Sequence, residues 1–150
     1  MSVRLTDDEG WEVLRTSHTG ILTTLRRDGT PVSLPVWFVV DDHAVLVAGP
    51  AASHKFSRLG RDPRVVFLVE SGQAWRELQA VHLTGVGEVV ESPDWGTVDL
   101  MFDAKYADFR TPRSAMPASA RKHYDAGRAL VRITPTEPFI SWDNRRLETR

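Results

Sequence analysis

Short apolar runs separated by turn-forming residues dominate the first half of the chain. Apolar and β-branched residues cover 21–25 and 31–40, and an Asp-Gly pair at 28–29 supplies the positive backbone angles of a tight hairpin turn. Two aspartates at 41–42 form the next turn, and a third apolar run covers 43–48. The pattern predicts three antiparallel strands joined by hairpins.

Helical patterns flank these strands. Thr6 and Glu9 have the spacing at which each side chain satisfies the other's backbone N–H group, so a helix is predicted from there to about His18. A short basic helix is predicted over 51–60. A dense apolar strand resumes at 64–70, so this helix connects two strands.

The second half of the chain combines one long strand with helices. The strand covers 78–91 and contains Gly85 and Gly87, which commonly mark a bulge or the close approach of another backbone or a ligand. Two helices follow, the first from 93 onward with one apolar face and the second over 118–126. The remaining segments are a loop at 110–117 and strands at 129–134 and 139–142.

These elements predict the fold class. Six or seven mostly antiparallel strands with hairpin turns and peripheral helices indicate an α+β domain built on a small closed or split β-barrel. A doubly wound parallel sheet would need a helix after nearly every strand. A chain of 150 residues suits one domain, spanning residues 1–150.

Charge and composition exclude several classes of binding partner. The chain has 19 basic and 20 acidic residues, so no broad electrostatic field attracts a nucleic-acid backbone or an anionic membrane. No apolar run approaches the length of a membrane-spanning helix, and no secretory signal opens the chain. There is no cysteine, which excludes disulfides and thiolate chemistry and fits a reducing cytoplasm.

The histidines give no sign of a metal site. They lie at positions 18, 43, 54, 82 and 123, with no ligand spacing between them and no carboxylates nearby that form a triad. We therefore expect no metal, and no catalytic residue is identified from the sequence.

Ser53 and Lys55 lie at the start of the short basic helix. The first turn of a helix exposes unpaired backbone N–H groups, to which a hydroxyl and a lysine add a donor and a positive charge. Arg58 lies three residues on, on roughly the same helix face. This combination indicates a phosphate-binding site, although a solvated surface helix is the alternative for each side chain.

Six passages, in order, resemble the pyridoxamine 5'-phosphate oxidase-like split-barrel superfamily, and within it the flavin/deazaflavin oxidoreductases. The passages are the run His18-Thr19-Gly20-Ile21-Leu22-Thr23-Thr24 after the first helix, the hairpin Asp28-Gly29-Thr30-Pro31, the run Pro35-Val36-Trp37-Phe38, the motif Lys55-x-x-x-Leu59-x-x-Asp62-Pro63-Arg64-Val65, the motif Leu78-x-x-Val81-x-Leu83-x-Gly85-x-Gly87-Glu88-Val89-Val90, and the run Ser141-Trp142-Asp143-Asn144. They cover nearly the whole chain.

The resemblance implies a homodimer with two cofactor sites at the subunit interface, each built from both chains. The cofactor would be the deazaflavin F(420) or FMN, with its phosphate near Ser53 and Lys55 and its ring along 35–38. The candidate cofactor-binding residues are Pro35, Val36, Trp37, Phe38, Ala48, Gly49, Ser53, Lys55, Arg58 and Trp142.

The resemblance also implies an oxidoreductase that transfers a hydride between this cofactor and a small conjugated substrate. The loop at 110–117, with Arg110 and Arg113, is a candidate cover that meets an anionic substrate. Pyridoxamine phosphate oxidase activity itself is not expected, because the run at 142–147 is only loosely similar to that enzyme's substrate-binding tail and the chain is shorter. The alternative function is a non-catalytic protein that stores or senses a flavin or haem.

Overall fold

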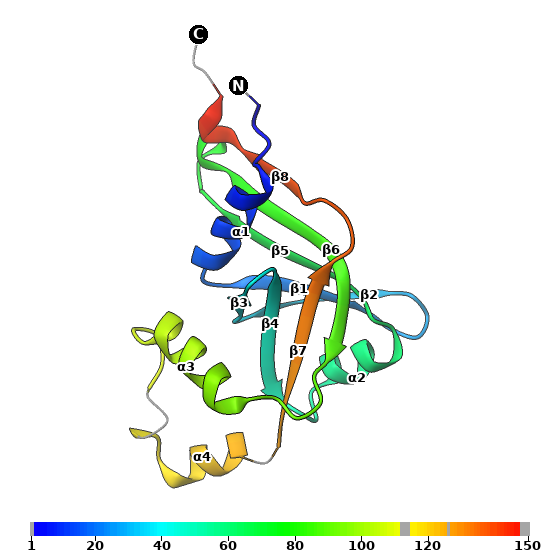
Figure 1. The fold of residues 1–150 in the computed structure, drawn as a ribbon, viewed down its shortest axis with the longest axis vertical. Helices are drawn as coiled ribbons and strands as arrows, with labels where there is room; N and C mark the ends of the chain where they lie inside the picture. The colour runs from blue at the N-terminus through cyan, green and yellow to red at the C-terminus, as the bar shows by residue number, and fades with distance from the viewer. Residues whose placement is uncertain (1, 112–114, 126, 148–150) are drawn as a thin grey trace.

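The structure is a computed structural model that describes residues 2–111, 115–125 and 127–147. It consists of a curled antiparallel sheet with helices around it (Figure 1). The elements in chain order are α1 (Asp7–Thr16), β1 (Gly20–Leu25), β2 (Pro31–Val36), β3 (Val39–Asp41), β4 (Ala44–Pro50), α2 (His54–Arg61), β5 (Arg64–Ser71), η1 (Trp75–Glu77), β6 (Gln79–Val89), α3 (Trp95–Tyr106), α4 (Ala118–Asp125), β7 (Arg128–Pro135), β8 (Ile140–Asp143) and η3 (Asn144–Arg146).

The strand order explains the curled shape of the sheet. Neighbouring strands follow the order β2-β1-β5-β6-β7-β4-β3, and β8 pairs with β6. The two ends of this order, β2 and β3, are consecutive in the chain and are joined by Trp37 and Phe38 alone. The sheet must therefore curl until its ends meet. This arrangement confirms the predicted α+β split barrel.

The prediction of one strand over 31–40 is wrong, because the chain forms β2 and β3 there. β2 pairs with β1 and β3 pairs with β4, at opposite ends of the strand order. At the break, the Phe38 N–H donates to the Tyr106 hydroxyl over 2.8 Å, in place of a neighbouring strand. An apolar run does not show where a strand changes partners, so the break was not visible in the sequence.

The helix predictions hold with shifted boundaries. The Thr6–Glu9 capping box is confirmed, and α1 ends at Thr16 because both the backbone N–H and the hydroxyl of Ser17 bond to the Val13 carbonyl oxygen. α2 begins at His54, three residues later than predicted, because residues 51–53 form a turn. The predicted helix over 118–126 corresponds to α4, which ends at Asp125, and residue 126 lies outside the described residues.

The barrel is filled by one apolar cluster, and a second lies outside it. α1 and α2 supply Trp11, Leu14, Phe56 and Leu59 to the interior cluster, so both helices pack on the barrel's core. α3 instead packs with residues of β3, β4 and β7 in the second cluster. In the described part of the chain, no helix has the length and apolar character needed to cross a membrane.

Gly85 shows why β6 requires a glycine. A Cβ atom at this position would lie 2.2 Å from the Thr134 carbonyl oxygen on β7. The predicted close approach of another backbone is therefore confirmed. β6 pairs with β8 through residues 79–82 and with β7 through residues 85–89, so the change of partner falls just before this glycine.

Candidate functional site

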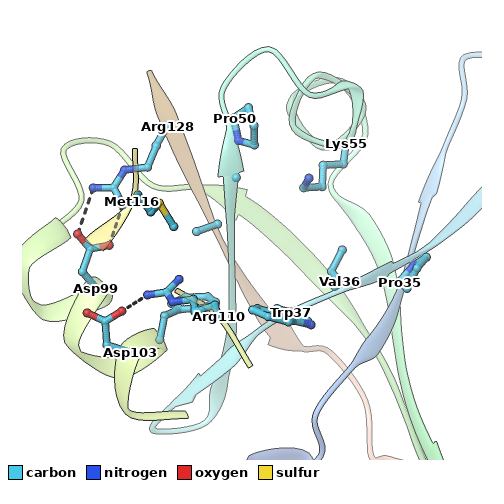
Figure 2. Close-up of a pocket in the computed structure, with 13 residues that line it drawn as sticks. Pro35, Val36, Trp37, Pro50, Lys55, Asp99, Asp103, Arg110, Met116 and Arg128 are labelled. Carbon is cyan, nitrogen blue, oxygen red and sulfur yellow. Dashed lines mark hydrogen bonds and ion pairs between the residues drawn. The ribbon is translucent and has the colours of Figure 1, made fainter. Parts of the chain in front are cut away.

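A pocket of 520 Å³ lies between α2 and α3 (Figure 2). Strand β2 contributes Pro35 and Val36 to its wall, and the last three residues of β4, 48–50, also line it. Its volume falls within the range of about 300–1,000 Å³ typical of small-molecule sites. The pocket therefore has room for a planar cofactor.

Lys55 forms one end of this pocket. Its ammonium donates to the Ser53 hydroxyl over 3.2 Å, and a Cβ on Gly49 would lie 3.2 Å from the same nitrogen. Burial, and to a smaller extent the charge of Arg58, lower the pKa of Lys55. Among the described residues no carboxylate lies within ion-pair distance of Lys55. An anion bound there would supply the missing charge.

The opposite end of the pocket carries paired charges. Asp99 and Asp103 lie four residues apart on α3, so they share a helix face. Arg128 donates to both oxygens of Asp99 over 2.7 and 3.2 Å, and Arg110 forms an ion pair with Asp103. Figure 2 shows both pairs on the α3 side, across the pocket from Lys55. This end is polar but electrically balanced.

Trp37 gives the pocket a flat aromatic surface. Its indole ring stacks on Tyr106, with ring centroids 4.3 Å apart and an interplanar angle of 3°. His18 packs edge-on against the same two rings. Phe102 and Met116 add further apolar surface to the pocket. A planar conjugated ring suits such a lining.

Most of the residues predicted for the cofactor site come together here. Six of them line the pocket and one, Ser53, touches it through Lys55. The six are Pro35, Val36, Trp37, Ala48, Gly49 and Lys55.

Three predicted residues lie elsewhere. Phe38 is fully buried in the barrel core, and Arg58 donates through Nε to the Thr24 hydroxyl over 2.7 Å. Trp142 lies on β8 and pairs with Ala80. Neither Arg58 nor Trp142 lines the pocket, so within one chain these two are separate from it.

Sequence reasoning missed the α3 wall of the pocket. Asp99, Asp103 and Arg128 line it, and only the two aspartates left a signal, as acidic residues four apart on an otherwise apolar helix. Arg110 lines the pocket as expected for a substrate contact, but it is paired with Asp103. Arg113 lies outside the described residues.

The donor set of the pocket is typical of an organic anion rather than a metal ion. Its carboxylates form ion pairs with arginines, and the remaining charged group of the lining is the Lys55 ammonium. Within residues 2–111, 115–125 and 127–147, no three histidine, aspartate or glutamate side chains gather closely enough to hold a metal.

Comparison with solved structures gives the same fold. The chain is 28% identical to the conserved hypothetical protein Rv2991 from Mycobacterium tuberculosis, with a TM-score of 0.78 over 99% of this chain and 92% of that one. An F(420) reductase is 24% identical, with a TM-score of 0.66 over 86% and 94% of the two chains. The FAD binding protein from Mycobacterium smegmatis is 18% identical, with a TM-score of 0.61 over 92% and 93%.

The family model described as pyridoxamine 5'-phosphate oxidase matches residues 6–140, from the cap of α1 to the first residue of β8. This match includes every strand of the barrel order and all residues found in the pocket. The resemblance carried by the sequence motifs is thus confirmed, and the chain belongs to the pyridoxamine 5'-phosphate oxidase family.

Proposed function

We propose that this protein is an oxidoreductase that transfers a hydride between a bound F(420) or FMN and a small conjugated substrate. The observation that carries the proposal is the pocket itself, which joins a desolvated lysine to a flat aromatic surface. Similarity to an F(420) reductase and an FAD binding protein supports a cofactor of the flavin type.

The residues present fit such a cofactor. Lys55 and the Ser53 hydroxyl would hold the phosphate, since a charge-assisted contact to an ammonium is stronger than a neutral hydrogen bond. Gly49 leaves the space beside the Lys55 ammonium free of a side chain. Pro35, Val36 and Trp37 would lie along the ring. The bound cofactor supplies the hydride chemistry, while these residues orient it and exclude water.

We also propose a homodimer with shared sites. The face of the sheet turned away from the core carries a cross-strand row through β2, β1, β5, β6 and β8. The row consists of Pro35, Ile21, Leu68, His82 and Ile140.

A second subunit on this face would lie beside the pocket, because Pro35 belongs to both the row and the pocket wall. Trp142 lies two residues from Ile140 along β8 and so points to the same face. Its predicted approach to a cofactor therefore requires the neighbouring subunit's pocket. Sedimentation should show a dimer, and a stable monomer that binds cofactor would contradict the shared site.

Cofactor binding is tested by titrating the purified protein with FMN and with F(420) and following absorbance. Lys55→Met should weaken binding of the preferred cofactor by about 1.5–3 kcal/mol, the range for a hydrogen bond to a charged group. Lys122→Met is the matched control, because it removes an exposed lysine of α4 that lies outside the pocket lining. Equal cofactor affinity of the wild type and Lys55→Met would show that Lys55 does not contact the cofactor.

Catalysis is tested separately, by steady-state turnover of reduced cofactor with quinones, biliverdin and nitroaromatics. Oxidation of the cofactor that depends on one of these acceptors would support the oxidoreductase. Tight binding without turnover of any acceptor would favour the storage or sensing protein. Turnover of pyridoxine phosphate would contradict the expectation that this chain is not a pyridoxamine phosphate oxidase.

The basic residues after Lys55 offer a way to separate the two cofactors. Arg64 is paired with Asp62, whereas Arg58 and Arg61 bond to neutral acceptors at the β1 hairpin, Thr24 Oγ1 and the Leu25 carbonyl. Neither bond neutralises the charge of its arginine, so both guanidinium groups can bind a long anionic tail such as that of F(420). Replacing both with glutamine should weaken F(420) binding and leave FMN binding unchanged. An equal loss of affinity for F(420) and for FMN would argue against binding of the F(420) tail by Arg58 and Arg61.

A further inference from the structure

The Tyr106 side chain forms hydrogen bonds to the backbone at the break between β2 and β3. The Tyr106 hydroxyl accepts the Phe38 N–H, and it lies 2.8 Å from the carbonyl oxygens of both His18 and Phe38, which share its single proton. Tyr106 is fully buried. Its hydroxyl therefore replaces the strand ladder at the point where the two ends of the sheet meet.

The ring of Tyr106 supports the pocket surface. Trp37 stacks on it in a parallel arrangement, and the same indole lines the pocket. Figure 2 shows Trp37 between Val36 and Arg110, where β2 ends. The orientation of the indole is thus fixed from behind, by a residue that does not itself line the pocket.

Tyr106 also belongs to the opposite wall. It is the last residue of α3, and this helix carries Asp99, Phe102 and Asp103 into the pocket. The preceding residue, Lys105, places its ammonium 3.6 Å from the centre of the Phe38 ring. The last turn of α3 thus contacts both residues of the break. It couples the α3 wall of the pocket to the β2 wall.

We propose that Tyr106 is a positioning residue, which sets the spacing between the α3 and β2 walls and holds Trp37 flat against the ring of the bound cofactor. This inference rests on the proposed function. Tyr106 should therefore affect the binding of the cofactor's ring and leave the binding of its phosphate unchanged. Lys55, at the far end of the pocket, has the complementary effect.

The test compares FMN with riboflavin, which has the same ring and no phosphate, in three variants. Tyr106→Phe removes the hydroxyl and keeps the ring. Lys55→Met removes the phosphate contact. Ser141→Ala is the control, because it removes a hydrogen bond of 3.1 Å to the Leu5 N–H, away from the pocket lining. Affinity, the fluorescence of bound FMN and the melting temperature are measured for each.

Tyr106→Phe should weaken the binding of FMN and of riboflavin by the same factor, about three- to tenfold, because the break between β2 and β3 loses the hydrogen bonds of the hydroxyl. Lys55→Met should weaken FMN alone. Fluorescence of bound FMN should rise in Tyr106→Phe, because an indole held against a flavin quenches it, and should stay unchanged in Ser141→Ala. A merely structural tyrosine would lower the melting temperature without changing the fluorescence of bound FMN.

Two outcomes overturn the inference and are distinguishable from failure of the proposed function. Equal affinities and equal fluorescence of bound FMN in the wild type and Tyr106→Phe would show that Tyr106 has no positioning role, without contradicting the proposed cofactor site. A loss for FMN without a loss for riboflavin would also reject it. If the wild type binds neither FMN, riboflavin nor F(420), the proposed function fails, and the positioning role fails with it.

Discussion

The two ends of the pocket carry their charges in opposite arrangements, with one lysine at the α2 end and two ion pairs at the α3 end. At the α2 end, Lys55 is half-buried, and its hydrogen-bond partner among the described residues is a neutral hydroxyl. At the α3 end, Arg128 and Arg110 each have an aspartate as partner. Burying a charge is costly unless it is paired. The paired end is complete within the chain, and we propose that a ligand completes the Lys55 end.

Side chains that hold the fold also differ in their contacts from the lysine that we propose serves binding. Arg128 is fixed by its two bonds to Asp99 and by its position 4.1 Å from the Trp95 ring centre. It joins β7 to α3 and so supports the wall. The hydrogen bond of Lys55 joins no two elements, because its hydroxyl partner Ser53 is the N-cap residue of the same helix. Substitutions at the two ends should therefore affect different measurements.

The largest effect on stability is expected for Asp99→Ala. The substitution leaves the Arg128 guanidinium against Trp95 without its counter-charge, and the pair is only 23% and 37% exposed. The free energy of unfolding should fall by about 1–3 kcal/mol, measured by urea denaturation. Glu12→Ala is the control, because it breaks the Arg15 pair, whose side chains are 50% and 63% exposed. Equal losses in the two variants would show that the Asp99 pair is no more than a surface contact.

Lys55→Met should weaken ligand binding without lowering the stability of the ligand-free protein, the reverse of the effect expected for Asp99→Ala. Without ligand, the free energy of unfolding should stay the same or rise by at most about 1 kcal/mol, since a desolvated charge is removed. With saturating cofactor, the wild type should gain much more thermal stability than the variant, because a ligand that binds only the folded state stabilises it. The measurement is the melting temperature with and without FMN or F(420). A large loss of stability in the ligand-free variant would make Lys55 structural.

Lys105 is a second partly buried lysine, and it lies in the last turn of α3 and outside the pocket lining. Among the described residues its ammonium has no hydrogen-bond partner, and burial lowers its pKa to about 8 from 10.5. Between these two values the unfolded chain holds more protons, so this group makes the free energy of unfolding rise with pH. Lys105→Met should remove that rise, as followed by urea denaturation between pH 7 and about 10.5. An unchanged pH profile would show that the ammonium is solvated.

The sequence predicted the features of the fold and of the candidate site that depend on local signals. Lys55 and Ser53 were visible because a helix start with a hydroxyl and a lysine is a local pattern. Gly85 was visible because a glycine inside a strand commonly marks a bulge or a close backbone approach. The split barrel followed from hairpin turns and from motif order across the chain.

The α3 wall was not predicted, for a physical reason. Asp99 and Arg128 meet through tertiary structure, 29 residues apart in the chain, and neither has a local signal for the pair. Tyr106 contacts Phe38 over 68 residues, so the break at Trp37 and Phe38 could not be read from an apolar run. Such contacts depend on how the sheet curls, which the hydrophobic pattern leaves open.

The smallest effect is expected for Asp103→Asn. Asp103 is 52% exposed, so solvent screens its pair with Arg110, and the free energy of unfolding should change by less than about 1 kcal/mol. The substitution leaves Arg110 charged and unpaired at the pocket wall, which makes this end resemble the Lys55 end. Affinity for a carboxylate-bearing acceptor such as 4-nitrobenzoate should then rise, with no rise for its methyl ester. Binding of both by calorimetry checks this, and a fall in 4-nitrobenzoate affinity would mean that Asp103, not Arg110, contacts the ligand.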